Sequence, residues 1–234
     1  MILTDNNFAT IVKAVELGRR LYDNLVKYIR FQMGALAGMI VTFLGASILN
    51  IVSGIPFLPM QTLWVNFTTQ IFQAIGLGYG EPTEGLMKRR PRKPEQPILK
   101  RADTRWFVIA GLVMGIATLA VAAWAENQHG EDVARSMALA TFSIANLLFS
   151  FTARDELESI FSLDTFSDRT FIVASLLSAV SIILATELGF LQRVLDTVSL
   201  TGNQWLICIG AGLVVVAASE LKKLLARRHA HAHA

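Results

Sequence analysis

Charged residues are missing from a long stretch of this sequence. The fifty residues from Phe31 to Gly80 contain no Asp, Glu, Lys, Arg or His. Charged residues make up only 17% of the whole chain, against about 25% in average soluble domains, and 53% of the residues are hydrophobic. This balance excludes an ordinary soluble domain and predicts a membrane protein.

Two further features are scarce or absent. The one cysteine, Cys208, lies in an apolar run and has no partner for a disulfide, so it gives no information on the redox compartment. The first thirty residues lack the apolar core of a signal peptide. They carry eight charged residues instead: Asp5, Lys13, Glu16, Arg19, Arg20, Asp23, Lys27 and Arg30. We therefore expect the chain to start on the cytoplasmic side.

Apolar windows of spanning length recur along the chain. A membrane-spanning helix needs about 17–25 predominantly apolar residues. Six windows fit within 31–221, and they predict an all-α, polytopic bundle of six transmembrane helices. The predicted spans are 31–52, 61–79, 106–125, 136–153, 170–186 and 203–219.

The positive charges indicate an orientation. With both termini in the cytoplasm, 19 of the 21 Lys and Arg residues fall on the cytoplasmic side, and only Arg135 and Arg193 lie outside. This distribution follows the positive-inside rule. The basic loop 80–105 is then a cytoplasmic loop that contacts anionic headgroups. The expected partner of this loop is the lipid bilayer, and we do not expect nucleic acid to bind.

The first span is predicted to begin inside a longer helix. From Arg19 nothing interrupts a helix until the turn that follows Val52, and these 34 residues would extend about 50 Å. We expect residues 19–30 to form a cytoplasmic stalk below the membrane, and residues 222–234 to form a cytoplasmic tail.

The second span contains an unusual polar cluster, in the sequence LWVNFTTQIFQ (63–73). On an α-helix, Asn66, Thr69 or Gln70, and Gln73 share one face. Buried amides are costly in hydrocarbon unless something pairs with them. Two interpretations stay open at this point: the side chains bond helices together, or they bind a transported ion.

Several blocks in order resemble one family, the P-type cation-transporting ATPases, and in particular calcium pumps. The opening MILTDNNFATIVKAVELGRRLYDNLVKYIRF resembles the passage from the phosphorylation domain into the fifth membrane helix. LWVNFTTQ is similar to the sixth helix, GEPTEGLMKRRPRKPEQPIL to the loop that follows it, and SLTGNQW…ELKKLLARR to the tenth helix. The resemblance implies helices five to ten of a pump, with residues 1–18 as a remnant of the phosphorylation domain.

The resemblance also implies a cation site on the second span. Asn66 and Thr69 match ligands of the family, and Gln70 stands where calcium pumps have an Asp. The metal would thus be a transported cation at Asn66, Thr69 and Gln70, with Gln73 on the same predicted face. Carboxylates are missing at other matching positions, which hold Leu36, Met39 and Ser143. Secondary candidates on the fourth span are Ser143 and Asn146, which form one face with Ser150.

Pairs of glycines mark two spans as closely packed. Gly34 and Gly38 on the first span, and Gly111 and Gly115 on the third, each follow a Gly-x-x-x-Gly pattern that lets backbones approach. The family packs its fifth helix against its seventh in this way. We interpret these glycines as helix-packing residues and not as ligands.

The family's catalytic motifs do not occur in this sequence. It contains no DKTG phosphorylation motif, no nucleotide-binding segment and no actuator TGE. We therefore expect the chain alone to have no cofactor and not to hydrolyse ATP; the parent pump would use ATP and Mg. The expected partner is the missing N-terminal half, in the plasma or inner membrane. The alternatives are a small membrane protein that partners or regulates a pump, and a passive channel or carrier.

Overall fold

The computed structural model consists of α-helices with short 3₁₀ and π segments. It describes residues 7–80, 85–88, 98–99, 101–154 and 168–231, with the side chains of 101–103 and 226–231 left aside. Much of the predicted loop 80–105 and part of the tail 222–234 lie outside these ranges. The helices are α1 (Phe8–Leu49), η1 (Ile51–Gly54), α2 (Pro59–Trp64), η2 (Val65–Gln70), α3 (Ile71–Gly78), η3 (Leu86–Lys88), α4 (Arg101–His129), α5 (Glu131–Ala153), α6 (Arg169–Glu187), α7 (Gly189–Leu195) and α8 (Gly202–His231).

Among the described residues, five helices are long and apolar enough to cross a membrane: α1, α4, α5, α6 and α8. The chain is therefore an all-α integral membrane protein with five candidate spans. The predicted window 61–79 does not form a single long α-helix. It is divided into α2, the π-helical η2 and α3, which follow one another without a gap.

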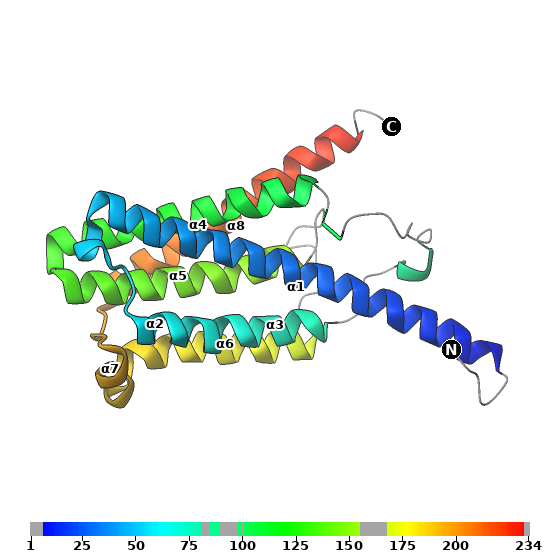
Figure 1. Ribbon diagram of the computed structural model, residues 1–234, viewed down its shortest axis with the longest axis horizontal. Helices are drawn as coiled ribbons and strands as arrows, with labels where there is room; N and C mark the ends of the chain where they lie inside the picture. The colour runs from blue at the N-terminus through cyan, green and yellow to red at the C-terminus, as the bar shows by residue number, and fades with distance from the viewer. Residues whose placement is uncertain (1–6, 81–84, 89–97, 100, 155–167, 232–234) are drawn as a thin grey trace.

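α1 is one continuous helix of 42 residues, and it crosses Gly18 without a break. Its N-terminal part extends beyond the ends of α3, α5 and α6 (Figure 1). We call this end of the bundle the projecting end. At the other end the helix stops at Leu49, three residues before the predicted Val52. Asn50 adopts a left-handed conformation with φ of 53° and caps the helix there. Asn tolerates this conformation better than most residues.

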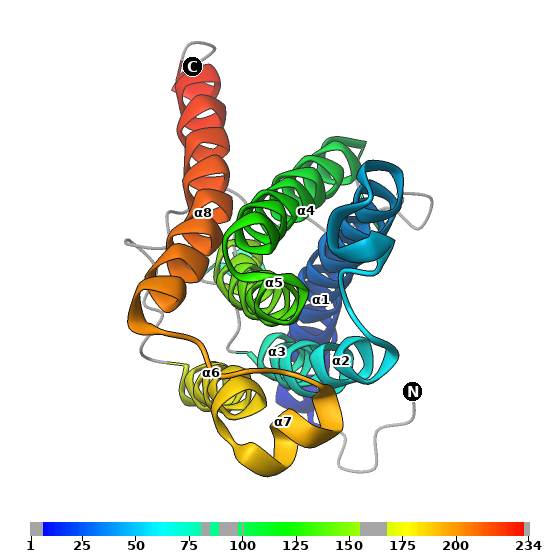
Figure 2. The same cartoon turned by 90° about the vertical axis from the view of Figure 1, so that its left-hand side faces the viewer.

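α5 occupies the centre of the bundle. Seen end-on, the other long helices and α3 surround it (Figure 2). Of its apolar window, 83% is buried, whereas the windows of the other candidate spans are 28–44% buried. The core around α5 includes Phe142 and Phe149, which are fully buried. A helix buried on all sides needs neighbours at every face, and this explains why polar side chains of α5 lie inside the protein.

α1 and α4 approach each other closely at glycines. A Cβ atom added to Gly111 would lie 2.7 Å from the backbone nitrogen of Gly38 and 2.9 Å from the carbonyl carbon of Ala37. One added to Gly115 would lie 3.0 Å from the Gly38 oxygen. The structure therefore brings Gly38, Gly111 and Gly115 together. Gly34 lies elsewhere, because an added Cβ there would meet the ring of Phe149 on α5.

Candidate cation site

A pocket of about 330 Å³ lies between α1 and the η2–α3 segment. Two of the predicted site residues, Asn66 and Gln70, line it. From α1 it is lined by Leu36 and Met39, where the resemblance had placed missing ligands, and by Gln32 and Tyr28. The polar lining consists of amides and a phenol, so it offers oxygen atoms without a formal charge.

The pocket is built where the helix is irregular. Residues Val65–Gln70 form a π-helix, with hydrogen bonds from residue i+5 to residue i. The hydroxyl of Thr68 donates to the carbonyl oxygen of Trp64 at 2.7 Å. A π turn contains more residues than an α turn and rotates the side chains after it. Such bulges occur frequently at functional sites.

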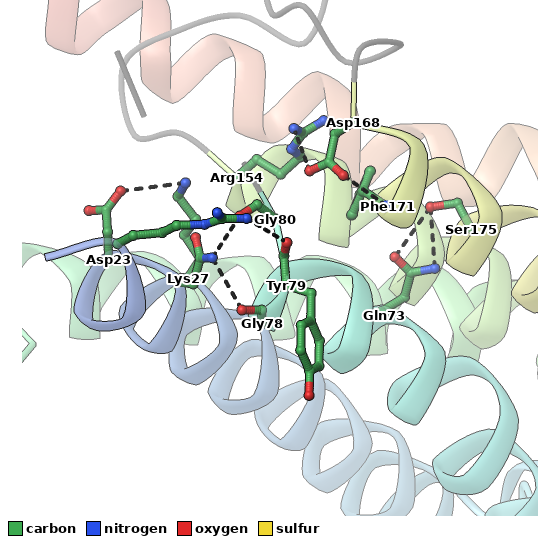
Figure 3. Close-up of polar contacts among 12 residues, drawn as sticks. Asp23, Lys27, Gln73, Gly78, Tyr79, Gly80, Arg154, Asp168, Phe171 and Ser175 are labelled. Carbon is green, nitrogen blue, oxygen red and sulfur yellow. Dashed lines mark hydrogen bonds and ion pairs between the residues drawn. The ribbon is translucent and has the colours of Figure 1, made fainter. Parts of the chain in front are cut away.

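Gln73 does not lie on the pocket side. Its Nε2 donates to the hydroxyl of Ser178 at 3.0 Å, and its Oε1 accepts from the hydroxyl of Ser150 at 2.6 Å. Ser175 lies at 3.5 Å (Figure 3). The expectation that Asn66, Gln70 and Gln73 share one α-helical face is therefore wrong. The π turn separates them, so that Gln70 faces α1 while Gln73 faces α5 and α6.

Thr69 is buried, with 1% of its surface exposed, and the described lining of the pocket does not include it. Its backbone carbonyl oxygen accepts a weak hydrogen bond from Ser178 at 3.5 Å. Of the three residues that match family ligands or stand in a ligand position, the structure thus brings Asn66 and Gln70 to the pocket and places Thr69 toward α6.

On α5, Ser143 and Asn146 are both buried. Neither Oδ1 nor Nδ2 of Asn146 has a hydrogen-bond partner among the described residues. An unsatisfied buried polar group costs about 1–3 kcal/mol. α5 packs against η2, and Ser150, one turn beyond Asn146, reaches Gln73. Of the two secondary candidates, Asn146 is therefore the one with coordinating capacity to spare.

Side chains of α1 hold the end of α3 next to the site. Nδ2 of Asn24 donates to the carbonyl oxygens of Gly78 at 3.1 Å and Gly80 at 2.8 Å. Nε of Arg20 donates to Gly80 at 3.2 Å. Figure 3 shows these glycines at the end of α3. Helix C-termini leave carbonyl groups without partners, and α1 provides donors for them.

A second polar contact closes the projecting end between α5 and α6. The carboxylate of Asp168 accepts from the backbone nitrogen of Phe171 at 3.1 Å and pairs with Arg154 at 3.3 Å (Figure 3). The Arg154 guanidinium also lies 4.6 Å from the ring centre of Phe171. Asp168 is 2% exposed, so this ion pair fixes the start of α6 against the end of α5.

The sequence analysis missed Gln32. Its Nε2 donates to Oε1 of Gln70 at 3.0 Å. One signal was available, since Gln32 is a lone amide in an apolar span and such residues need a partner. The identity of that partner depends on how α1 packs against η2, which the sequence pattern does not contain.

Among the described residues no three His, Cys, Asp or Glu side chains lie close enough together to hold a metal ion. The pocket and Asn146 instead present neutral amide oxygens. Such groups can coordinate a cation but supply no charge to balance it. These features define a class: a membrane helix bundle with an irregular, amide-lined helix in its interior.

Comparison with known proteins identifies the family within this class. Residues 54–225 match the family model described as "Cation transporting ATPase, C-terminus". The chain is 33% identical over 217 residues to a calcium-transporting ATPase of Bacillus subtilis, with 92% of this chain and 24% of that protein covered. It is 31% identical to a probable cation-transporting ATPase F of Mycobacterium bovis, with 94% and 24% covered. A calcium-transporting ATPase 1 of Lactococcus lactis is 28% identical, with 95% and 25% covered.

The chain belongs to the C-terminal membrane region of the P-type cation-transporting ATPases. It spans about a quarter of the length of the curated relatives it matches.

Proposed function

We propose that this chain contributes the cation-binding and translocation helices of an ATP-driven pump. The observation that carries the proposal is the pocket between α1 and η2, where Asn66 and Gln70 face an interior lined by neutral oxygen donors. The orphaned amide of Asn146 on the adjoining helix adds to it. In this proposal the transported cation binds at Asn66 and Gln70, with Thr69 and Asn146 in support.

The remaining parts of the machine belong to a partner. The pump half that is missing from this sequence would hold the phosphorylated Asp, ATP and Mg, and would add a helix that closes the pocket. A carboxylate on that helix would supply the charge that the described lining lacks, because calcium sites usually include carboxylates. Both termini would lie in the cytoplasm of a plasma or inner membrane, and residues 19–30 of α1 would act as the stalk.

The test uses the complete pump that contains this chain. Replacing Asn66 with Ala removes one oxygen donor. It should weaken the apparent affinity for the native cation by about tenfold or more, since an interaction with a charged group contributes about 1.5–3 kcal/mol. Gln70→Asp adds a negative charge in a low-dielectric site and should tighten divalent binding.

The measurement is ATPase activity across calcium, magnesium, manganese, sodium and potassium concentrations. The proposal fails if Asn66→Ala and Gln70→Ala both leave every apparent ion affinity at the parent value while lowering thermal stability. The polar side chains would then only bond the helices together.

A further inference from the structure

Gln32 and Gln70 form a pair of amides at the wall of the pocket. Gln32 comes from α1 and Gln70 is the last residue of η2, and their side chains meet at 3.0 Å with Gln32 donating and Gln70 accepting. Both residues line the pocket together with Asn66. Three amides from two helices therefore surround the same space, and one of them lies outside the family resemblance quoted for this site.

We propose that Gln32 is a positioning residue of the cation site, which holds the carbonyl oxygen of Gln70 available to the ion. This inference rests on the proposed function, since it concerns the same pocket. It adds a determinant of cation affinity on α1, at a position that the sequence comparison with calcium pumps did not single out.

The physical reason is the two-ended nature of an amide. A Gln side chain carries an acceptor oxygen and a donor NH₂ group at the same distance from the backbone, and it can exchange them by rotation. The NH₂ end carries partial positive charge and repels a cation. The N–H of Gln32 can be accepted by the oxygen of Gln70 but not by its nitrogen. The hydrogen bond therefore fixes the oxygen at the pocket wall, and its second lone pair stays free.

A contrasting amide shows that this arrangement is not ordinary helix bonding. Gln61 on α2 is fully buried, and both ends of its side chain pair with backbone groups. Its Oε1 accepts from the nitrogen of Leu58 at 3.0 Å, and its Nε2 donates to the carbonyl of Leu195 at 2.9 Å. Gln32 by comparison is half-buried, lines the pocket and bonds another lining side chain. Gln61 thus provides a matched control for a purely structural glutamine.

Gln32 also lies in register with the anchors of α3. Arg20, Asn24 and Gln32 are four and eight residues apart, so they share one face of α1. All three donate to the η2–α3 segment or the residues that follow it. The position of α1 relative to α3 therefore decides whether Gln32 reaches Gln70.

The experiment is a double-mutant cycle in the complete pump. Gln32→Met keeps the length of the side chain but removes its donor, and Gln70→Met removes the oxygen. The two single variants and the double variant are compared by the apparent affinity for the native cation in ATPase assays, with Gln61→Met as control. If Gln32→Met gives no folded pump, Gln32→Asn replaces it, because it keeps an amide too short to reach.

We expect Gln32→Met to weaken the apparent affinity by about three- to tenfold, the range of one hydrogen bond. Its effect should vanish in the Gln70→Met background, because Gln32 acts through Gln70. Gln61→Met should lower the melting temperature and leave affinity unchanged. Additive effects, or an affinity unchanged by Gln32→Met while Gln70→Met weakens it, would overturn the role of Gln32 alone. Unchanged affinity in every variant, Gln70→Met included, would contradict the proposed function itself.

Discussion

Gln73 joins three helices through its side-chain amide. It lies on α3, is fully buried, and bonds Ser150 on α5 and Ser178 on α6. Both ends of the amide are used, so little capacity remains for an ion. The side chain thus contributes to the stability of the bundle at the level of the site.

We expect Gln73→Leu to lower the melting temperature of the detergent-solubilised chain. The substitution leaves the buried hydroxyl groups of Ser150 and Ser178 short of a partner, at a cost of about 1–3 kcal/mol. Asn127→Ala is the control. The amide of Asn127 is exposed and bonds only Ala123 on its own helix, so its loss should change stability by no more than about 0.5 kcal/mol. A Gln73→Leu variant as stable as Asn127→Ala, with altered ion affinity, would make Gln73 a ligand.

Single residues of the site were predictable only in part. The amides at 66, 70 and 73 stand out in the sequence because polar side chains are rare in an apolar span. Their directions did not follow from it, since a period of 3.6 residues assumes an α-helix and η2 is a π-helix. The pairing of Gln32 with Gln70 depends on the packing of two helices.

Among the elements, the contact of α1 with α4 depends on the absence of side chains at particular glycines. Around Gly111 the nearest atoms are backbone atoms of Ala37 and Gly38, which cannot move without moving α1. Around Gly38 the nearest atom is the sulfur of Met114 at 3.0 Å, and a Met side chain can adopt another rotamer. The two glycines therefore differ in how much they restrict the contact.

We expect Gly111→Ala to lower the melting temperature by several degrees and Gly38→Ala to lower it less. The added methyl at 111 forces two backbones apart, which reduces the close packing on which membrane helices rely. Gly210→Ala on α8 is the matched control, because no atom lies within 4 Å of the added Cβ. Thermal unfolding in detergent measures all three. Equal melting temperatures for Gly111→Ala and Gly210→Ala would contradict the close contact.

Hydropathy located the helices better than it located their ends. The predicted windows 106–125, 136–153, 170–186 and 203–219 each lie within one long helix. The end of α1 was misplaced because Asn50 leaves the helix early, and no strong sequence signal such as Gly marks that position. The window 61–79 has the composition of a span, but composition does not reveal a π segment in its middle.

At the scale of the whole molecule, the 234-residue chain lacks the family's phosphorylation motif. Without that Asp there is no family nucleophile to attack ATP. We expect the purified chain to form no acyl-phosphate when it is incubated with labelled ATP and resolved on an acid gel. A complete calcium-transporting relative provides the positive control. A phosphorylated band from this chain alone would mean that it carries a catalytic centre of its own.

The long α1 helix has the proportions of a lever. Along its axis, Phe8 lies about 45 Å from Gly38, where α4 holds the helix, and Gln32 lies about 9 Å from the same point. A rigid tilt about this contact that moves the N-terminus by about 5 Å would therefore displace Gln32 by only about 1 Å. A shift of that size is enough to break the 3.0 Å bond to Gln70, because hydrogen bonds of this kind span about 2.7–3.2 Å. A large movement outside the bundle thus becomes a small, on-or-off change in the orientation of one carbonyl oxygen.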